Sequence, residues 1–140
     1  MRAIDANIVM RLLFQDDAEQ ARLAGDLIGN EDVLVTTCVL LEASWVMRSV
    51  YGAAEREVAV ALLAFVRLPH VFATSPHVEA ALGWVGQGMQ LDDALIYADA
   101  HASSEFVTFD VRLAKLAARF DAEPPVRLLG RPLPPLPGLR

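Results

Sequence analysis

Short apolar runs alternate with longer amphipathic segments along most of the chain. Each run spans four or five residues, contains β-branched or aromatic side chains, and is bounded by turn residues or a helical pattern, as buried strands are. Because these runs are apolar on both faces, they are typical of a parallel sheet that helices cover. The pattern predicts five strands, at Met1–Ile4, Val33–Thr36, His70–Ala73, Glu105–Phe109 and Val126–Leu129.

The segments between these runs carry apolar residues at helical spacing. Asp16–Ile28 is expected to form a helix that ends at Gly29-Asn30, a common C-terminal signal. Thr37 and Ser75 are expected to cap two further helices, and Pro76 suits the first helical position after Ser75. The other helical segments are Cys38–Val50, Ala53–Val66, Asp92–Ala102 and Val111–Phe120.

The alternation of strand and helix predicts an α/β fold. Right-handed crossovers between parallel strands put helices on both faces of a sheet, so we expect a three-layer α/β/α sandwich with a five-stranded, mostly parallel sheet. The expected domain covers residues 1–129. Residues 130–140 are expected to form an extended tail, because prolines at 132, 134, 135 and 137 disfavour a packed element.

Composition narrows the class of protein. The chain has 140 residues, of which 54% are hydrophobic and 21% charged, so a single domain with a substantial core is expected rather than disorder. No apolar run reaches the roughly 18 residues that a membrane span requires. Asp5 interrupts the N-terminal apolar run, which therefore does not resemble a signal peptide. A cytoplasmic protein is expected.

Charge and cysteine content exclude some kinds of site. The net charge of −6 counts against an extended nucleic-acid surface, which should be basic, but not against an enzyme that contacts phosphate through a bound metal. The single cysteine, Cys38, excludes an intrachain disulfide and a multi-cysteine zinc site. Cys38 and Trp45 lie among apolar neighbours, and both are expected in the core.

Two acids follow expected strands directly. Asp5 comes after the first strand and Asp110 after the fourth. Ligands of parallel sheets bind beyond the carboxyl ends of the strands, so the two carboxylates share one edge if the strands are neighbours. The ordinary alternative is that each acid caps the helix that follows it.

Two further acids lie in helical segments. The helical neighbours of Glu42 are apolar, so we expect it on a buried or half-buried face, where a carboxylate is costly unless it pairs with a distant arginine or binds a cation. Asp92 and Asp93 both fall in a first helical turn, where the helix dipole favours acids. Carboxylates gathered by the fold would repel one another unless they held a divalent metal. The other acids, Glu55 among them, are expected on solvated surface.

These residues resemble the motifs of the PIN-domain ribonucleases, in particular the VapC toxins of bacterial toxin–antitoxin pairs. The resemblance covers roughly residues 1–130. It rests on the order and spacing of four pieces: Ile4-Asp5-Ala6-Asn7, Glu42, Asp93-Ala94-Leu95 and Val107-Thr108-Phe109-Asp110.

The resemblance implies an endoribonuclease in which Asp5, Glu42, Asp93 and Asp110 hold Mg²⁺ or Mn²⁺ and a metal-activated water cleaves RNA. It also implies a cognate antitoxin as partner and a homodimer. The supporting residues are Asn7, Thr108 and Asp92, and Arg112 and Lys115 are candidates for contact with RNA phosphates. The chain departs from the family at Gln90, where an acid is common, and at Asp92, where a small or neutral residue is usual. Asp93 is therefore assigned to the metal, and the role of Asp92 is left open.

Three other functions fit the sequence less well. A haloacid-dehalogenase-like phosphatase needs a second Asp two residues after the first and a Lys, but this chain has Asn7 there and Lys115 as its only lysine. A receiver-type signalling domain needs an acidic pair after the first strand, which is absent. A non-catalytic PIN-like interaction module usually lacks one or more of the four acids, whereas all four are present here.

Overall fold

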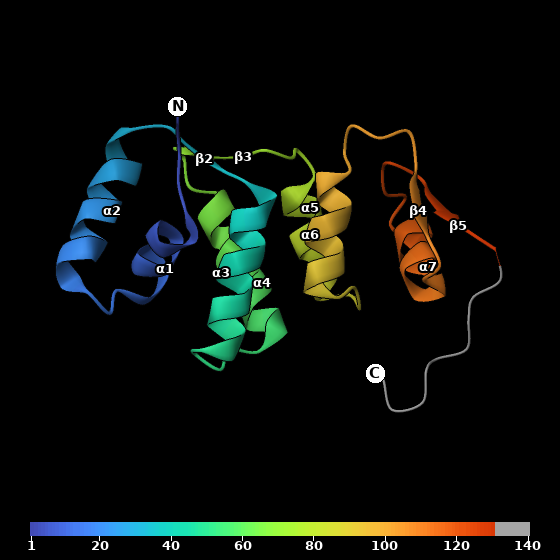
Figure 1. Ribbon diagram of the computed structural model, residues 1–140, viewed down its shortest axis with the longest axis horizontal. Helices are drawn as coiled ribbons and strands as arrows, with labels where there is room; N and C mark the ends of the chain where they lie inside the picture. Colours follow the sequence, from blue (N-terminus) through green and yellow to red (C-terminus); the bar gives the residue numbers. More distant parts are fainter. Residues whose placement is uncertain (131–140) are drawn as a thin grey trace. The chain divides into compact units, whose positions relative to one another are not determined.

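The structure is a computed structural model that describes residues 1–130 (Figure 1). Strands and helices alternate as the sequence predicts. The Pro-rich tail expected at residues 130–140 lies outside the described residues except for Gly130. In chain order, the elements are β1 (Arg2–Ala3), α1 (Ala6–Phe14), α2 (Ala18–Asn30), β2 (Val33–Val35), α3 (Thr37–Ser49), α4 (Glu55–Val66), β3 (Val71–Ala73), α5 (Val78–Val85), α6 (Leu91–Asp99), β4 (Phe106–Thr108), α7 (Val111–Arg119) and β5 (Val126–Leu128).

All strand pairs in the described chain are parallel. One sheet has the order β1-β2-β3, with Arg2 opposite Val33 and Val33 opposite Val71. The other sheet pairs β4 with β5, with Phe106 opposite Val126. The α/β fold and the positions of all five strands are therefore confirmed, and the strands are distributed over sheets of three and two. The chain forms two compact units, which divide after Asp99.

The first unit is organised around α3. This helix packs against α1, α4 and α6, and so connects the elements on which, or next to which, three of the candidate acids lie. Burial of apolar side chains between these helices and the sheet is the main stabilising contribution to such a unit. The largest side chains that are fully buried include Tyr97, Phe65, Leu40, Met47 and Leu62.

The second unit is built from β4, α7 and β5. Helix α7 packs against both strands and buries Leu113 and Ala117. The backbone N–H of Leu129 donates to the carbonyl of Thr108 at 2.8 Å and extends the parallel ladder beyond β5. This arrangement holds the turn between β4 and α7, where Asp110 lies.

Helix α1 was not predicted from the sequence. It begins directly after Asp5, whose side chain caps it, and it ends at Gln15, which adopts the left-handed conformation with φ 51°. A helical signal is present in this segment, because its polar residues Asn7 and Arg11 are four positions apart and share one face, while α1 buries Ala6, Val9 and Met10. The capping alternative for Asp5 is therefore correct as a description of the local structure.

Several predicted helix starts were wrong by a few residues. Helix α2 is capped by Asp17, and α3 is capped by Thr36 rather than Thr37. Helix α5 begins at Val78, not at Pro76, and the Ser75 hydroxyl makes two other hydrogen bonds. It donates to the carbonyl of Ala98 at 2.5 Å and accepts from the N–H of His77 at 3.1 Å. Ser75 thus ties the loop after β3 to the end of α6.

A polar network joins the turn between α1 and α2 to Tyr51, which follows α3. Arg11 donates to Gln20 at 2.6 Å and to Asp16 at 3.0 Å, and the Tyr51 hydroxyl donates to the other oxygen of Asp16 at 2.6 Å. The rings of Phe14 and Tyr51 stack with centroids 4.0 Å apart. The Tyr51 hydrogen bond lowers the pKa of Asp16 below its ordinary value of 3.8, and Asp16 in turn raises the pKa of Tyr51 above 10.0.

We expect Tyr51→Phe to lower the melting temperature modestly at pH 7, because it removes the hydrogen bond to Asp16 and keeps the stacked ring. The depressed pKa of Asp16 means that this stabilisation is present above pH 3.8 and lost as the pH falls through the lowered value. The raised pKa of Tyr51 means that the same stabilisation is present below pH 10.0 and is lost as the pH rises through the raised value. Thermal unfolding followed by circular dichroism between pH 3 and 7 measures the trend.

The Asp16→Asn background is the control for this experiment. There, Tyr51→Phe should have a smaller effect at pH 7, because the ionised acceptor is already absent. An equal loss of melting temperature in both backgrounds would contradict the proposed coupling.

Candidate functional site

Asp5 lies where β1 leaves the three-stranded sheet. The N–H of Ile4 still donates to the carbonyl of Leu34 at 3.1 Å, so the ladder runs up to the residue before Asp5. Asp5 is exposed, and its Oδ1 accepts from the N–H of Ile8 at 3.1 Å. Capping engages one carboxylate oxygen in this bond, which leaves Oδ2 as the atom through which Asp5 can bind a cation.

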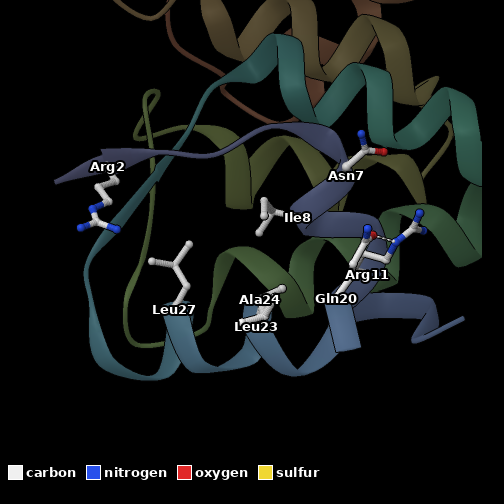
Figure 2. Close-up of a pocket in the computed structure, with 8 residues that line it drawn as sticks. All are labelled: Arg2, Asn7, Ile8, Arg11, Gln20, Leu23, Ala24 and Leu27. Carbon is white, nitrogen blue, oxygen red and sulfur yellow. Dashed lines mark hydrogen bonds between the residues drawn. The ribbon is translucent and has the colours of Figure 1, made fainter. Parts of the chain in front are cut away.

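Asn7 is exposed on α1 and lines a groove between α1 and α2 (Figure 2). The groove has a volume of about 350 Å³ and is mainly apolar. Figure 2 shows Ile8 of α1 facing the apolar residues of α2, with the Arg11–Gln20 hydrogen bond at one end. Its lining consists of Arg2, Asn7, Ile8, Arg11, Gln20, Leu23, Ala24 and Leu27.

Glu42 is exposed on α3, so the prediction of a buried or half-buried face was wrong. It forms no hydrogen bond or ion pair with residues 1–130, and its carboxylate is open to solvent. Cys38 and Trp45 share this exposed face, with Trp45 62% exposed, which also contradicts the core positions expected for them. The reason is that α3 is apolar all round and buries the opposite stripe: Thr37, Leu40, Ala43, Ser44 and Met47.

The first turn of α6 carries Asp92 and Asp93 in different surroundings. Arg48, in the last turn of α3, donates from Nη2 to Asp92 Oδ1 at 2.9 Å. Asp93 is half-buried. The backbone N–H of Leu91 donates to Glu55 Oε1 at 2.6 Å, so Glu55 is not the solvated side chain that the sequence predicts. Asp92 therefore has a structural partner in Arg48.

Asp110 lies in the second unit, at the turn from β4 into α7. Its Oδ1 accepts from the N–H of Leu113 at 3.1 Å, so Asp110 caps α7. This agrees with the alternative that Asp110 is the cap of the helix that follows it. Thr108 Oγ1 accepts from the N–H of Asp110 at 3.0 Å and thereby holds the turn. Arg112 and Lys115 are both exposed on α7.

Three of the four candidate acids belong to the first unit. Asp5, Glu42 and Asp93 lie on α1, α3 and α6 or next to them, and α3 packs against both other helices. Within residues 1–130, however, no three His, Cys, Asp or Glu side chains are close enough together to hold a metal ion. The donors themselves are of the type that Mg²⁺ and Mn²⁺ prefer, namely carboxylate oxygens. The four-acid metal site thus stays a prediction.

Sequence reasoning did not foresee the two contacts at the start of α6. Arg48 and Asp92 are 44 residues apart, and Glu55 and Leu91 are 36 apart. No local pattern signals such pairs, because they depend on which helices become neighbours.

Among the described helices, none is both long and apolar enough to cross a membrane.

Comparison with protein-family models identified one family. The model of the PIN domain matches residues 3–119, which include β1 through α7 and therefore Asp5, Glu42, Asp93 and Asp110. Comparisons with curated proteins and with solved structures gave no match. Since the family match covers most of the sequence and agrees with the parallel α/β fold, this chain belongs to the PIN-domain family.

Proposed function

We propose that this protein is a metal-dependent endoribonuclease of the VapC type, the toxin of a type II toxin–antitoxin system. The observation that carries the proposal is the PIN-domain match, which spans all four candidate acids. PIN domains are typically metal-dependent nucleases. The match favours this function over a haloacid-dehalogenase-like phosphatase, and the presence of every acid favours it over a non-catalytic PIN-like module.

The residues that would hold Mg²⁺ or Mn²⁺ are Asp5, Glu42, Asp93 and Asp110. When bound, such an ion polarises a phosphate oxygen and makes water a better nucleophile. The exposure of Asp5 and Glu42 supports this role, since their carboxylates are accessible to a cation and to substrate. Asp93 or Glu42 would orient the attacking water and accept its proton.

The remaining roles belong to polar and basic side chains. Thr108 supports Asp110 through the 3.0 Å hydrogen bond to its N–H, and Asn7 is exposed two residues after Asp5. Arg112 and Lys115 would contact the RNA phosphates from α7. Water attacks phosphorus and the bond to the 3′-oxygen breaks, so the products carry a 5′-phosphate and a 3′-hydroxyl.

The proposed partners are an RNA substrate, a cognate antitoxin and a second copy of the chain. The proposed location is the cytoplasm. Exposed apolar side chains on the first unit are available for contact with a protein partner. Val50 is 67% exposed and Val60 is 64% exposed. If a small neighbouring gene encodes the antitoxin, its product should co-purify with this protein and inhibit RNA cleavage.

Metal dependence provides the direct test. Chelation should stop RNA cleavage, and Mg²⁺ or Mn²⁺ should restore it. In calorimetric titrations with Mn²⁺, the double variant Asp5→Asn/Asp93→Asn should lose most of the binding seen with the wild type, because two hard anionic ligands are removed.

Asp92→Asn is the matched control for this titration. It removes one negative charge from the same helical turn, but the amide oxygen of Asn can still accept from Arg48 and hold the turn, so binding should be close to that of the wild type. Equal metal binding by the wild type and the double variant would refute the proposed site. Loss of binding in Asp92→Asn alone would make Asp92 the ligand instead of Asp93.

A further inference from the structure

We propose that Glu55 is a positioning residue for Asp93. Its carboxylate, which projects from α4, holds the first turn of α6 and thereby fixes where the Asp93 carboxylate lies. The inference deepens the proposed nuclease function and rests on it for the role of Asp93. It concerns a residue outside the four-acid motif, at the point where three helices of the first unit meet.

The start of α6 is held from another helix. Asp5, Asp17, Thr36 and Asp110 cap α1, α2, α3 and α7 from the residue directly before each helix. For α6, the N–H of its first residue, Leu91, donates to Glu55 Oε1 at 2.6 Å, and Glu55 is half-buried. The first N–H groups of a helix have no partner within the helix, so this bond satisfies a donor that folding would otherwise leave unpaired.

A second contact fixes the next residue of the same turn. Asp92 Oδ1 accepts from Arg48 at 2.9 Å, and the Nε of Arg48 donates to the carbonyl of Ser44, which holds the guanidinium against α3. Leu91 is thus tied to α4 and Asp92 to α3. Since successive helical residues are about 100° apart around the axis, fixing these two sets the direction of Asp93 as well.

Burial on the other side of the turn leaves little freedom for adjustment. Leu91 and Ala94 are fully buried, so the turn cannot rotate without disrupting the core of the first unit. Loss of the Glu55 bond would therefore not be compensated by rotation. Instead, the first turn would fray, and Asp93 would sample positions unsuited to its role.

The effect of Glu55 on position can be separated from the effect of its charge. Leu91 needs only an acceptor, and the amide oxygen of Gln can accept from the same N–H. Glu55→Gln should therefore keep the turn in place, whereas Glu55→Ala should release it. Glu57 is a matched control, because it is an exposed acid two residues away in the first turn of α4.

The experiment compares Glu55→Ala, Glu55→Gln and Glu57→Ala with the wild type in three measurements on the full chain. Amide hydrogen exchange of Leu91 is measured without metal, Mn²⁺ affinity by calorimetry, and the kcat and KM of RNA cleavage at a temperature well below every melting transition. In Glu55→Ala we expect at least tenfold faster Leu91 exchange. Mn²⁺ affinity or kcat should fall roughly 10- to 100-fold, with KM little changed.

Glu55→Gln should restore all three quantities to within a few-fold of the wild type, and Glu57→Ala should not change them. Unchanged Leu91 exchange in Glu55→Ala would overturn the inference. So would faster exchange with unchanged Mn²⁺ affinity and kcat, because Glu55 would then be only structural. A wild-type protein that binds Mn²⁺ without cleaving RNA would refute the proposed function, while weaker Mn²⁺ binding by Glu55→Ala would still support positioning.

Discussion

Asp5→Asn is expected to reduce RNA cleavage about a hundredfold to a thousandfold while the protein stays folded. Removing one anionic ligand costs several kcal/mol of stabilisation at the reacting phosphate, and each 1.36 kcal/mol is a factor of about ten in rate. The fold should survive because Asn is as good a helix cap as Asp, so the bond to the N–H of Ile8 can be kept. Single-turnover cleavage of an RNA with saturating Mn²⁺ measures the effect.

Asp17→Asn is the matched control for Asp5→Asn. Asp17 caps α2 as Asp5 caps α1, with a 3.0 Å bond from the N–H of Gln20, and it has no proposed role in catalysis. Both variants should melt close to the wild type, but only Asp5→Asn should lose activity. If the two variants cleaved RNA equally well, Asp5 would be a helix cap and nothing more.

Leu40→Ala is expected to destabilise the protein by about 2–5 kcal/mol, the usual cost of truncating a fully buried leucine. Leu40 is 0% exposed and lies on α3, which packs against α1, α4 and α6. The cavity would therefore open at the centre of the first unit, where three helices share one neighbour. Urea unfolding followed by circular dichroism gives the free energy of unfolding.

Leu23→Ala is the comparison for Leu40→Ala. Both substitutions have the same chemistry and lie in 13-residue helices, but Leu23 is 54% exposed on α2. It should cost less than about 1 kcal/mol. Similar losses for the two variants would mean that α3 does not occupy the centre of the packed unit.

The strands could be predicted because their signal is local. Val33–Val35 is a run of β-branched and aliphatic residues next to turn residues, and nothing further along the chain is needed to recognise it. Helix ends were less predictable. Thr36 and Thr37 are equivalent as sequence, and only the backbone conformation shows that Thr36 caps α3. Ser75 is a good cap by residue type, but α5 begins only at Val78, and the Ser75 hydroxyl donates to Ala98, 23 residues away, a contact that no local pattern signals.

Which face of α3 is buried could not be predicted, for a different reason. Cys38 and Trp45 make the helix apolar on the side of Glu42, so the hydrophobic pattern does not distinguish the two sides. The neighbours of α3 decide the matter, because α1, α4 and α6 cover the stripe with Leu40 and Met47. Glu42 is left on the open side, where its side chain is exposed to solvent.

The linear pattern was sufficient for the five strands, for the helices other than α1, for the α/β fold, and for singling out Asp5, Glu42 and Asp110 together with the Asp92–Asp93 pair as candidates. These features depend on residue type and short-range spacing. The exposure of Glu42, the pairing of Arg48 with Asp92 and the bond from Leu91 to Glu55 depend on which helices pack together. Packing brings residues 36 and 44 positions apart into contact, and no periodicity along the chain encodes such a pair.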